Sequence, residues 1–196
     1  ITGERIDNSG TFATNGDIKA TSSLVNSGTV DGKGIDVAGA DFVNSGKINA
    51  DNIRARVVNT RNDGYIYSGN DVDLTTNTLI NTKEITAVNN VNAANANVTN
   101  NGKIASNGRV LLDNSAITNT GEILSGEIFM RNAQKFDNIG TIKGNNTELS
   151  INQDINLAGN LHGQQRLKIS GNNITNNGNT TGTGLIEINS NDFTNN

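Results

Sequence analysis

The chain has 196 residues, of which 33% are hydrophobic and 4% aromatic; it contains 37 Asn and 22 Gly residues and no Pro, Trp or Cys. The absence of Cys excludes disulfide bonds and thiolate metal sites, and a net charge of -4 gives no support to a nucleic-acid or anionic-membrane partner. Because the bulk composition is close to that of disordered chains, the spacing of the apolar residues decides whether the chain folds.

The pattern apolar-x-Asn-x-Gly-x-apolar recurs along the whole chain, at three steps of 18 residues and then seven steps of 19. Its first position is occupied by Ile6, Leu24, Phe42, Thr60, Leu79, Val98, Ile117, Phe136, Ile155, Ile174 and Phe193. Its Asn position is occupied by Asn8, Asn26, Asn44, Asn62, Asn81, Asn100, Asn119, Asn138, Asn176 and Asn195, with Leu157 as the exception. Its Gly position has one exception, Lys83. A fixed period of about 20 residues predicts stacked structural units.

Each unit contains a second apolar pair, whose members are two residues apart, as the side-chain alternation of a β-strand requires. The pairs are Ile18 and Ala20, Ile35 and Val37, Ile53 and Ala55, Val72 and Leu74, Val91 and Ala93, Val110 and Leu112, Ile128 and Met130, Leu149 and Ile151, Leu167 and Ile169, and Ile186 and Ile188. The last apolar position of the pattern is β-branched in most copies, which also favours strands. Each unit is therefore predicted to contain two or three short strands joined by polar corners.

Units of this length are too short for a helix-turn-helix repeat or a propeller blade, but they suffice for one turn of a β-solenoid. We predict an all-β fold, a right-handed parallel β-helix of about ten coils. At about 4.8 Å per coil, the rod would be on the order of 50 Å long. Residues 1–196 are expected to form a single β-helix repeat segment, a fragment of a longer exoprotein.

The recurrent Asn and Gly residues have physical roles in this fold. Gly is expected to supply the positive φ of a tight corner. Stacked Asn side chains are expected to form an internal ladder, in which each amide donates to the Asn carbonyl of the next coil. Local irregularity is expected at Lys83 and Leu157, and Thr60 and Thr180 are weak positions in their apolar columns.

The residues that follow the Gly position point outward and should stack from coil to coil. Among them, Glu84, Lys103 and Glu122 carry alternating charges, which attract on a sheet face. The sequence therefore predicts that the Lys103 amine lies within salt-bridge distance of Glu84 or Glu122.

The candidates for catalysis or metal binding are few. Asp71 and Asp73 flank Val72 and are the nearest approach to the paired carboxylates of a glycoside hydrolase, but outward charges on a strand usually form a solvated face. With Asn70 they also fall short of the six to eight oxygens that calcium requires. His162, the single histidine, has no evident partner for a nucleophilic triad and is expected at the surface. We predict no enzymatic activity, no cofactor and no metal site.

Arg54, Arg56 and Arg61 form a short basic cluster in the sequence, and Tyr65 and Tyr67 follow it. A short charge run is usually a solvated face. The aromatic residues nevertheless make these five positions the candidates for a binding site.

Segments such as Ile117-Thr-Asn-Thr-Gly-Glu-Ile123 and Val98-Thr-Asn-Asn-Gly-Lys-Ile104, with the strand pair that follows, resemble the filamentous haemagglutinin repeat. That repeat builds the rods of bacterial two-partner-secreted exoproteins, which include adhesins, haemolysins and contact-dependent growth-inhibition effectors of the CdiA type. The resemblance covers nearly the whole chain. It implies a right-handed parallel β-helix, export through an outer-membrane transporter partner, and a secreted or cell-surface location.

Three functions remain open at this point. The first is a structural shaft that projects a distal binding or toxin module. The second is an adhesive module that recognises a host or bacterial receptor, glycan or protein, along one face. The third is a polysaccharide-cleaving enzyme, for which no carboxylate-lined groove is evident. The fragment is also expected to stack end to end, because exposed solenoid ends need covering.

Overall fold

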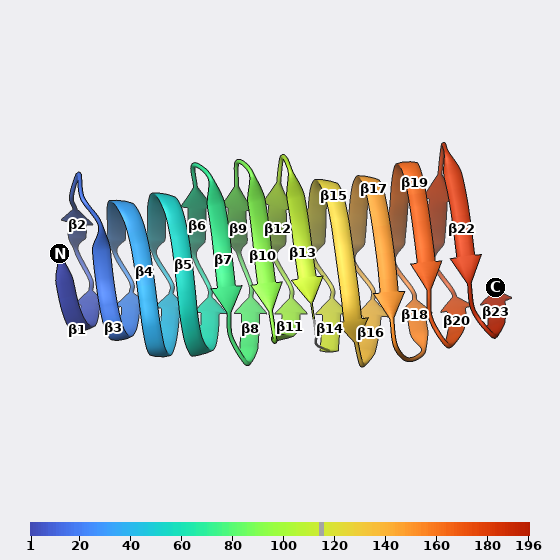
Figure 1. Ribbon diagram of the computed structural model, residues 1–196, viewed down its shortest axis with the longest axis horizontal. Helices are drawn as coiled ribbons and strands as arrows, with labels where there is room; N and C mark the ends of the chain where they lie inside the picture. The colour runs from blue at the N-terminus through green and yellow to red at the C-terminus, as the bar shows by residue number, and fades with distance from the viewer. Residues whose placement is uncertain (114–115) are drawn as a thin grey trace.

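The computed structural model describes residues 1–113 and 116–196, which form a β-solenoid of parallel strands without an α-helix (Figure 1). The two termini lie at opposite ends of the long axis. Near strands such as β7 and β10 run downward in Figure 1, and far strands such as β6 and β9 run upward, while the chain advances from left to right. The winding is therefore right-handed, and the predicted fold class is confirmed.

The strands differ in length because some continue around a corner of the coil without interruption. The 23 strands of the described residues are β1 (Thr2–Asn8), β2 (Thr11–Ala13), β3 (Ile18–Asn26), β4 (Thr29–Asn44), β5 (Lys47–Asn62), β6 (Tyr65–Ser68), β7 (Asp71–Thr75), β8 (Thr78–Asn81), β9 (Glu84–Ala87), β10 (Asn90–Ala94), β11 (Asn97–Asn100), β12 (Lys103–Ser106), β13 (Arg109–Asp113), β14 (Ala116–Asn119), β15 (Glu122–Ala133), β16 (Lys135–Asn138), β17 (Thr141–Ile151), β18 (Ile155–Leu157), β19 (Asn160–Ser170), β20 (Asn173–Asn176), β21 (Asn179–Gly182), β22 (Leu185–Asn189) and β23 (Asp192–Asn195).

Each coil contributes one segment to each of three faces, and all three faces are parallel sheets. Face 1 contains β8, β11, β14, β16, β18, β20 and β23. Face 2 contains β6, β9 and β12, and face 3 contains β7, β10 and β13. The long strands β4, β5, β15, β17 and β19 supply the matching segments of their own coils. We number the corners in chain order: corner 1 joins faces 1 and 2, corner 2 joins faces 2 and 3, and corner 3 joins face 3 to the next coil.

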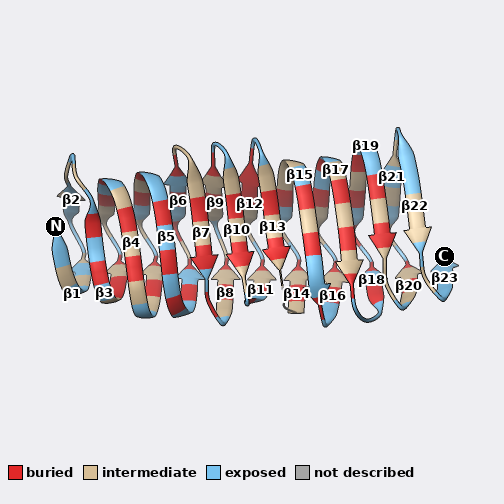
Figure 2. Ribbon diagram, viewed as in Figure 1, coloured by how far each residue is buried: buried red, intermediate tan, exposed pale blue. Residues whose placement is uncertain are grey.

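The core is a set of stacked columns that run along the axis. Buried and exposed positions alternate along the strands, as Figure 2 shows. In the first apolar column of face 1, Leu79, Val98 and Ile117 pair in register from coil to coil. Phe42 and Phe136 occupy the same column and are only 1% exposed, so the interior accommodates rings beside aliphatic side chains. The pattern seen in the sequence is thus the core itself.

One predicted strand pair is wrong. Ile128 and Met130 pair with Thr147 and Leu149, so the inward pair of this coil is Thr147 and Leu149. Ile151, predicted as an inward residue of this strand, pairs with Ala133 at corner 3. The buried Thr147 hydroxyl donates to the carbonyl of His162 at 3.2 Å. This bond lets a polar residue occupy a core column, which an assignment by hydropathy alone does not anticipate.

The change from 18-residue to 19-residue coils occurs at corner 2. Ala50 pairs with Ser68, 18 positions later, whereas Ile53 pairs with Val72, 19 positions later. The segment 69–71 therefore contains one residue more than the segment 51–52 on which it stacks. The three faces keep their register because the addition is confined to a corner.

Candidate functional site

The most extensive polar array of the molecule is the column of Asn side chains beside corner 1. The side-chain amide of Asn100 donates to Oδ1 of Asn119 at 2.8 Å, and Asn81 donates to Asn100 at the same distance. These side chains are 0% exposed. Bonds of the same kind connect Asn8, Asn26, Asn44, Asn62, Asn81, Asn100, Asn119 and Asn138 without interruption, and a separate bond joins Asn176 to Asn195.

Most ladder amides also donate to backbone carbonyls at corner 1, in their own coil, in the next coil or in both. Asn62 donates to the carbonyl of Gly64 at 2.9 Å and to the carbonyl of Glu84, one coil further, at 2.9 Å. Asn81 likewise donates to the carbonyl of Lys103 at 3.0 Å. The ladder thus satisfies buried backbone carbonyls as well as its own polar atoms, which would be costly if left unpaired.

Leu157 and Thr180 both depart from the sequence pattern, and both are neighbours of the ladder residue Asn176. Leu157 pairs with Asn138 and Asn176 in unbroken backbone register but offers no acceptor or donor. The Thr180 hydroxyl donates to Oδ1 of Asn176 at 2.9 Å. The irregularity expected at Leu157 is therefore limited to the side chains, and Thr180 satisfies the acceptor that an Asn at position 157 would otherwise satisfy.

The positive φ predicted for the glycines of the repeat pattern is wrong. Among the described residues, φ is positive only at Gly39, Asn95 and Asn132, none of which belongs to the Gly column. A Cβ added at Gly121 would instead collide with the carbonyl oxygen of Gly102, one coil below. Gly suits this position because successive corners stack backbone on backbone, which leaves little room for a side chain.

At Lys83, the exception in the Gly column, the expected irregularity is small. The neighbouring pairs Asn62 with Asn81 and Tyr65 with Glu84 keep their register. The Glu84 amide donates to the carbonyl of Gly64 at 3.2 Å, a longer bond than the 2.7 Å of the corresponding Glu122–Gly102 bond. The corner thus accommodates a side chain by a slight separation of the two coils.

The predicted ion pair on face 2 is confirmed. The Lys103 ammonium lies 3.1 Å from a carboxylate oxygen of Glu84. The Thr86 hydroxyl, which donates to the same carboxylate at 2.9 Å, and then Lys103 lower the pKa of Glu84. Glu122 pairs with Lys103 on the opposite side in backbone register. The charges therefore alternate along this column as predicted.

The predicted cluster of arginines and tyrosines is divided among three faces. Arg54 and Arg56 lie on face 3, where Arg56 forms an ion pair with Asp36 at 2.9 Å. Arg61 lies on face 1 and forms an ion pair with Asp63 at 2.6 Å. Tyr65 and Tyr67 lie on face 2 and are 50% and 44% exposed. Corners separate residues that are adjacent in sequence, so the five candidates do not form one surface.

The other residues considered for catalysis or metal binding form hydrogen bonds with side chains of a neighbouring coil. Asp71 accepts a hydrogen bond from Asn90 at 2.8 Å, and Asp73 accepts one from Asn92 at 2.7 Å. His162 Nδ1 lies 2.9 Å from the Thr181 hydroxyl. Within residues 1–113 and 116–196, no group of three His, Asp or Glu side chains could hold a metal ion. All three side chains thus bond to the coil that follows them.

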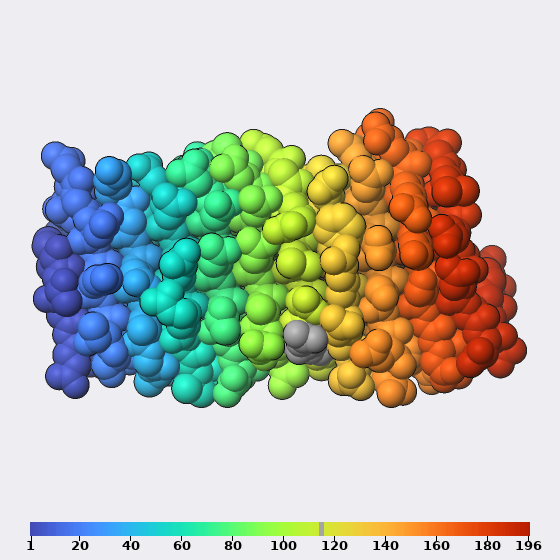
Figure 3. All heavy atoms as spheres, in the orientation of Figure 1, coloured from blue at the N-terminus to red at the C-terminus, as the bar shows by residue number. Residues whose placement is uncertain are grey.

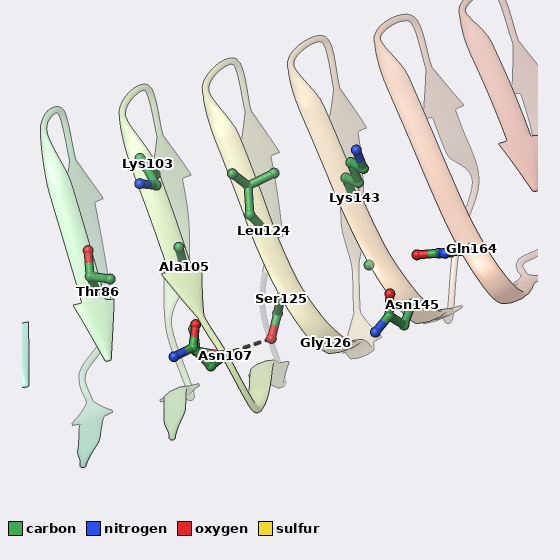
Figure 4. A pocket seen from close by; sticks show the side chains of 12 residues that line it. Thr86, Lys103, Ala105, Asn107, Leu124, Ser125, Gly126, Lys143, Asn145 and Gln164 are labelled. Atoms are coloured by element: carbon green, nitrogen blue, oxygen red, sulfur yellow. Dashed lines mark hydrogen bonds between the residues drawn. The ribbon is translucent and has the colours of Figure 1, made fainter. Parts of the chain in front are cut away.

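The surface depressions are open and shallow, and the visible face in Figure 3 has no deep cleft. Two adjoining hollows share Asn107, Gly126 and Asn145 at corner 2 and have volumes of about 580 and 460 Å³. We call them together the corner notch (Figure 4). The sequence signal for this feature is the step from the last apolar position of the pattern to the following strand pair, which is six residues from Ile104 to Val110 and five from Ile123 to Ile128.

The stacked parallel coils and the buried Asn ladder define the class of the molecule, a parallel β-solenoid. Comparisons of the chain with protein-family models, with curated proteins and with solved structures find no match. Within the described part of the chain, no helix is long and apolar enough to cross a membrane.

Proposed function

We propose that the chain is a structural shaft segment of a large bacterial exoprotein and has no catalytic role. The observation that supports this most strongly is the in-register stacking of coils on three faces along the described length, reinforced by the buried Asn ladder. Such stacking gives a stiff rod in which each coil contacts its neighbours. A shaft of this kind holds a distal module away from its point of attachment.

The resemblance to the filamentous haemagglutinin repeat supplies the biological setting of this proposal. The protein would be secreted or held at the bacterial cell surface after export through an outer-membrane two-partner secretion transporter. Its distal module would be an adhesin or a growth-inhibition toxin. A host-cell or bacterial receptor would then be the partner of that module.

Coil deletion in the full-length protein tests the shaft proposal. Because Leu79 stacks on Val98, removing residues 79–97 deletes one coil and preserves every column. A shaft should keep the distal module displayed and active after this change, whereas removing residues 79–88 should disrupt the stack and abolish display. Loss of the module's activity in the one-coil deletion, at unchanged surface level, would contradict the proposal.

The alternative proposal is that the segment itself recognises a glycan or protein. The specific observation in its favour is the pair Tyr65 and Tyr67, which occupy successive outward positions of β6 and are about half exposed. Aromatic faces at such spacing can pack against a flat ligand. Glycan-array binding that Tyr65→Ala abolishes and Arg61→Ala preserves would favour this alternative over the shaft.

We also propose that the isolated chain stacks end to end. The core-column residues Ile186 and Phe193 near the carboxyl end are 43% and 46% exposed. Stacking a second copy on them would bury this apolar surface and pair the terminal strand edges. Light scattering should show association that increases with concentration, and monodisperse monomers at high concentration would contradict it.

A further inference from the structure

The corner notch arises because two coils have shorter corners than the coils that flank them. Ile104 pairs with Ile123, 19 positions later, whereas Val110 pairs with Ile128, 18 positions later. The corner at 124–127 therefore contains one residue fewer than the corner at 105–109. The residue is regained at 162–166, since Leu161 follows Ile142 by 19 positions and Leu167 follows Thr147 by 20.

The short corners are compensated elsewhere in the same coil. Leu112 pairs with Met130, 18 positions later, but Ile117 pairs with Phe136, 19 positions later. The lost residue is thus restored at corner 3, and Asn132, with a φ of 57°, lies in this longer corner. The notch therefore forms because one residue is missing from corner 2 and one is added at corner 3. The core columns of the three faces stay in place.

The walls of the notch contain amide side chains that have no hydrogen-bond partner. Asn107, Asn145 and Gln164 form no side-chain hydrogen bond with residues 1–113 or 116–196, although they surround one depression (Figure 4). Elsewhere, outward Asn residues commonly bond to a neighbouring coil, as Asn90 does when it donates to Asp71 of the preceding coil. Each free amide offers both a donor and an acceptor to a ligand.

The floor of the notch adds an apolar contact and a positive charge. Leu124, which points outward and is half-buried, lies between Lys103 and Lys143 in Figure 4. Lys103 is paired with Glu84, but Lys143 is exposed and forms no ion pair with the described residues. In the first of the two hollows, the combination of three amides, one apolar side chain and one available ammonium favours a ligand rich in hydroxyl groups over a simple polyanion. The second hollow adds Arg109 and Glu127, one charge of each sign.

We propose that the corner notch binds an acidic saccharide, whose hydroxyl groups bond to Asn107, Asn145 and Gln164 and whose carboxylate pairs with Lys143. The C–H face of a sugar ring packs on Leu124. The longer corners at 105–109 and 162–166 wall the notch along the axis, so a linear chain would lie across the axis between them. This site is independent of the shaft proposal, since a rod can bear it without altering its stacking.

Isothermal titration calorimetry with tetragalacturonate tests the proposal. The double variant Lys143→Ala/Gln164→Ala should weaken binding by about tenfold or more, as expected for one lost ion pair and one lost hydrogen bond. The matched control Lys47→Ala/Gln134→Ala replaces an exposed Lys and an exposed Gln outside the notch and should leave the affinity unchanged. Maltotetraose, which lacks the carboxylates, should bind more weakly than tetragalacturonate.

Three results would overturn the proposal: no binding of tetragalacturonate at millimolar concentration, equal weakening in both double variants, or equally tight binding of tetraglutamate. The last would show a charge effect without saccharide recognition. As a measurement that needs no variant, side-chain amide resonances of Asn145 and Gln164 in the intact chain should shift on titration. If they do not move while binding is detected, the ligand lies elsewhere.

Discussion

The Thr180 hydroxyl donates to Oδ1 of Asn176 at 2.9 Å and takes the place of the ladder bond that Leu157 cannot form. Two departures from the sequence pattern, one polar residue lost from the Asn column and one gained in an apolar column, are thus coupled. The ladder stops at Asn138 and resumes at Asn176 without a break in the backbone register.

This coupling predicts a non-additive double-mutant cycle. Leu157→Asn alone should change the free energy of unfolding little, because the restored ladder bonds are offset by lost apolar burial and by a competing Thr180 hydroxyl. Leu157→Asn combined with Thr180→Val should be more stable than the sum of the single changes by about 1 kcal/mol. Chemical denaturation of the four proteins gives the coupling energy, and a value near zero would contradict the compensation.

Removing an internal ladder residue should be costly. Asn100→Ala leaves Oδ1 of Asn119 and the amide of Asn81 without their 2.8 Å partners in a buried environment. The free energy of unfolding should fall by more than about 1 kcal/mol. Asn77→Ala, at an exposed position without a side-chain hydrogen bond to the described residues, is the control and should stay within about 0.5 kcal/mol of wild type. Equal midpoints for the two variants would exclude the ladder as a source of stability.

Thr60→Val should stabilise the protein. The Thr60 hydroxyl is buried in an apolar column, where it has no hydrogen-bond partner among the described residues. Replacing it by a methyl group of similar size should raise the free energy of unfolding by about 1 kcal/mol. Thr76→Val is the matched comparison, because the buried Thr76 hydroxyl lies 3.1 Å and 3.0 Å from the carbonyls of Val58 and Thr78. That change should destabilise, and two effects of the same sign would disprove the argument.

The reason for Gly at corner 1 can be tested at two positions of the same column. A Cβ at Gly121 would collide with the carbonyl of Gly102, whereas a Cβ at Gly10 meets no atom within 4 Å. Gly121→Ala should therefore lower the free energy of unfolding by about 2–3 kcal/mol, and Gly10→Ala should have little effect. Comparable losses at both sites in thermal or urea unfolding would favour a conformational requirement instead of close stacking.

The Glu84–Lys103 pair predicts a pH-dependent contribution to stability. Because Thr86 and Lys103 lower the pKa of Glu84 in the folded state, the contribution is present above the unfolded pKa, whose ordinary value is 4.5, and is lost as pH falls through the folded pKa. Glu84→Gln should therefore be less stable than wild type near neutral pH, by less than about 1 kcal/mol since the pair is partly exposed. The difference should vanish at low pH, and a constant difference across the titration would refute the assignment.

Much of the fold follows from the sequence because a solenoid repeats one geometry. The 18- and 19-residue steps bring Asn81, Asn100 and Asn119 into one file and place Lys103 beside Glu84. The error at Thr147 has a local cause: its hydroxyl is satisfied by a carbonyl of the next coil, which hydropathy does not encode.

The sequence by itself determined the period, the inward columns of faces 1 and 2, the ladder and the pairing of Glu84 with Lys103, since all of these depend only on the total length of a coil. The tertiary structure decided how that length is distributed among three corners. This distribution placed Arg61 and Tyr65 on different faces, made the corner notch between Asn107 and Gln164, and brought glycine corners into backbone contact. The physical reason is that hydrogen-bonded pairing between coils sets the corner lengths, whereas the repeat period gives only the sum of faces and corners.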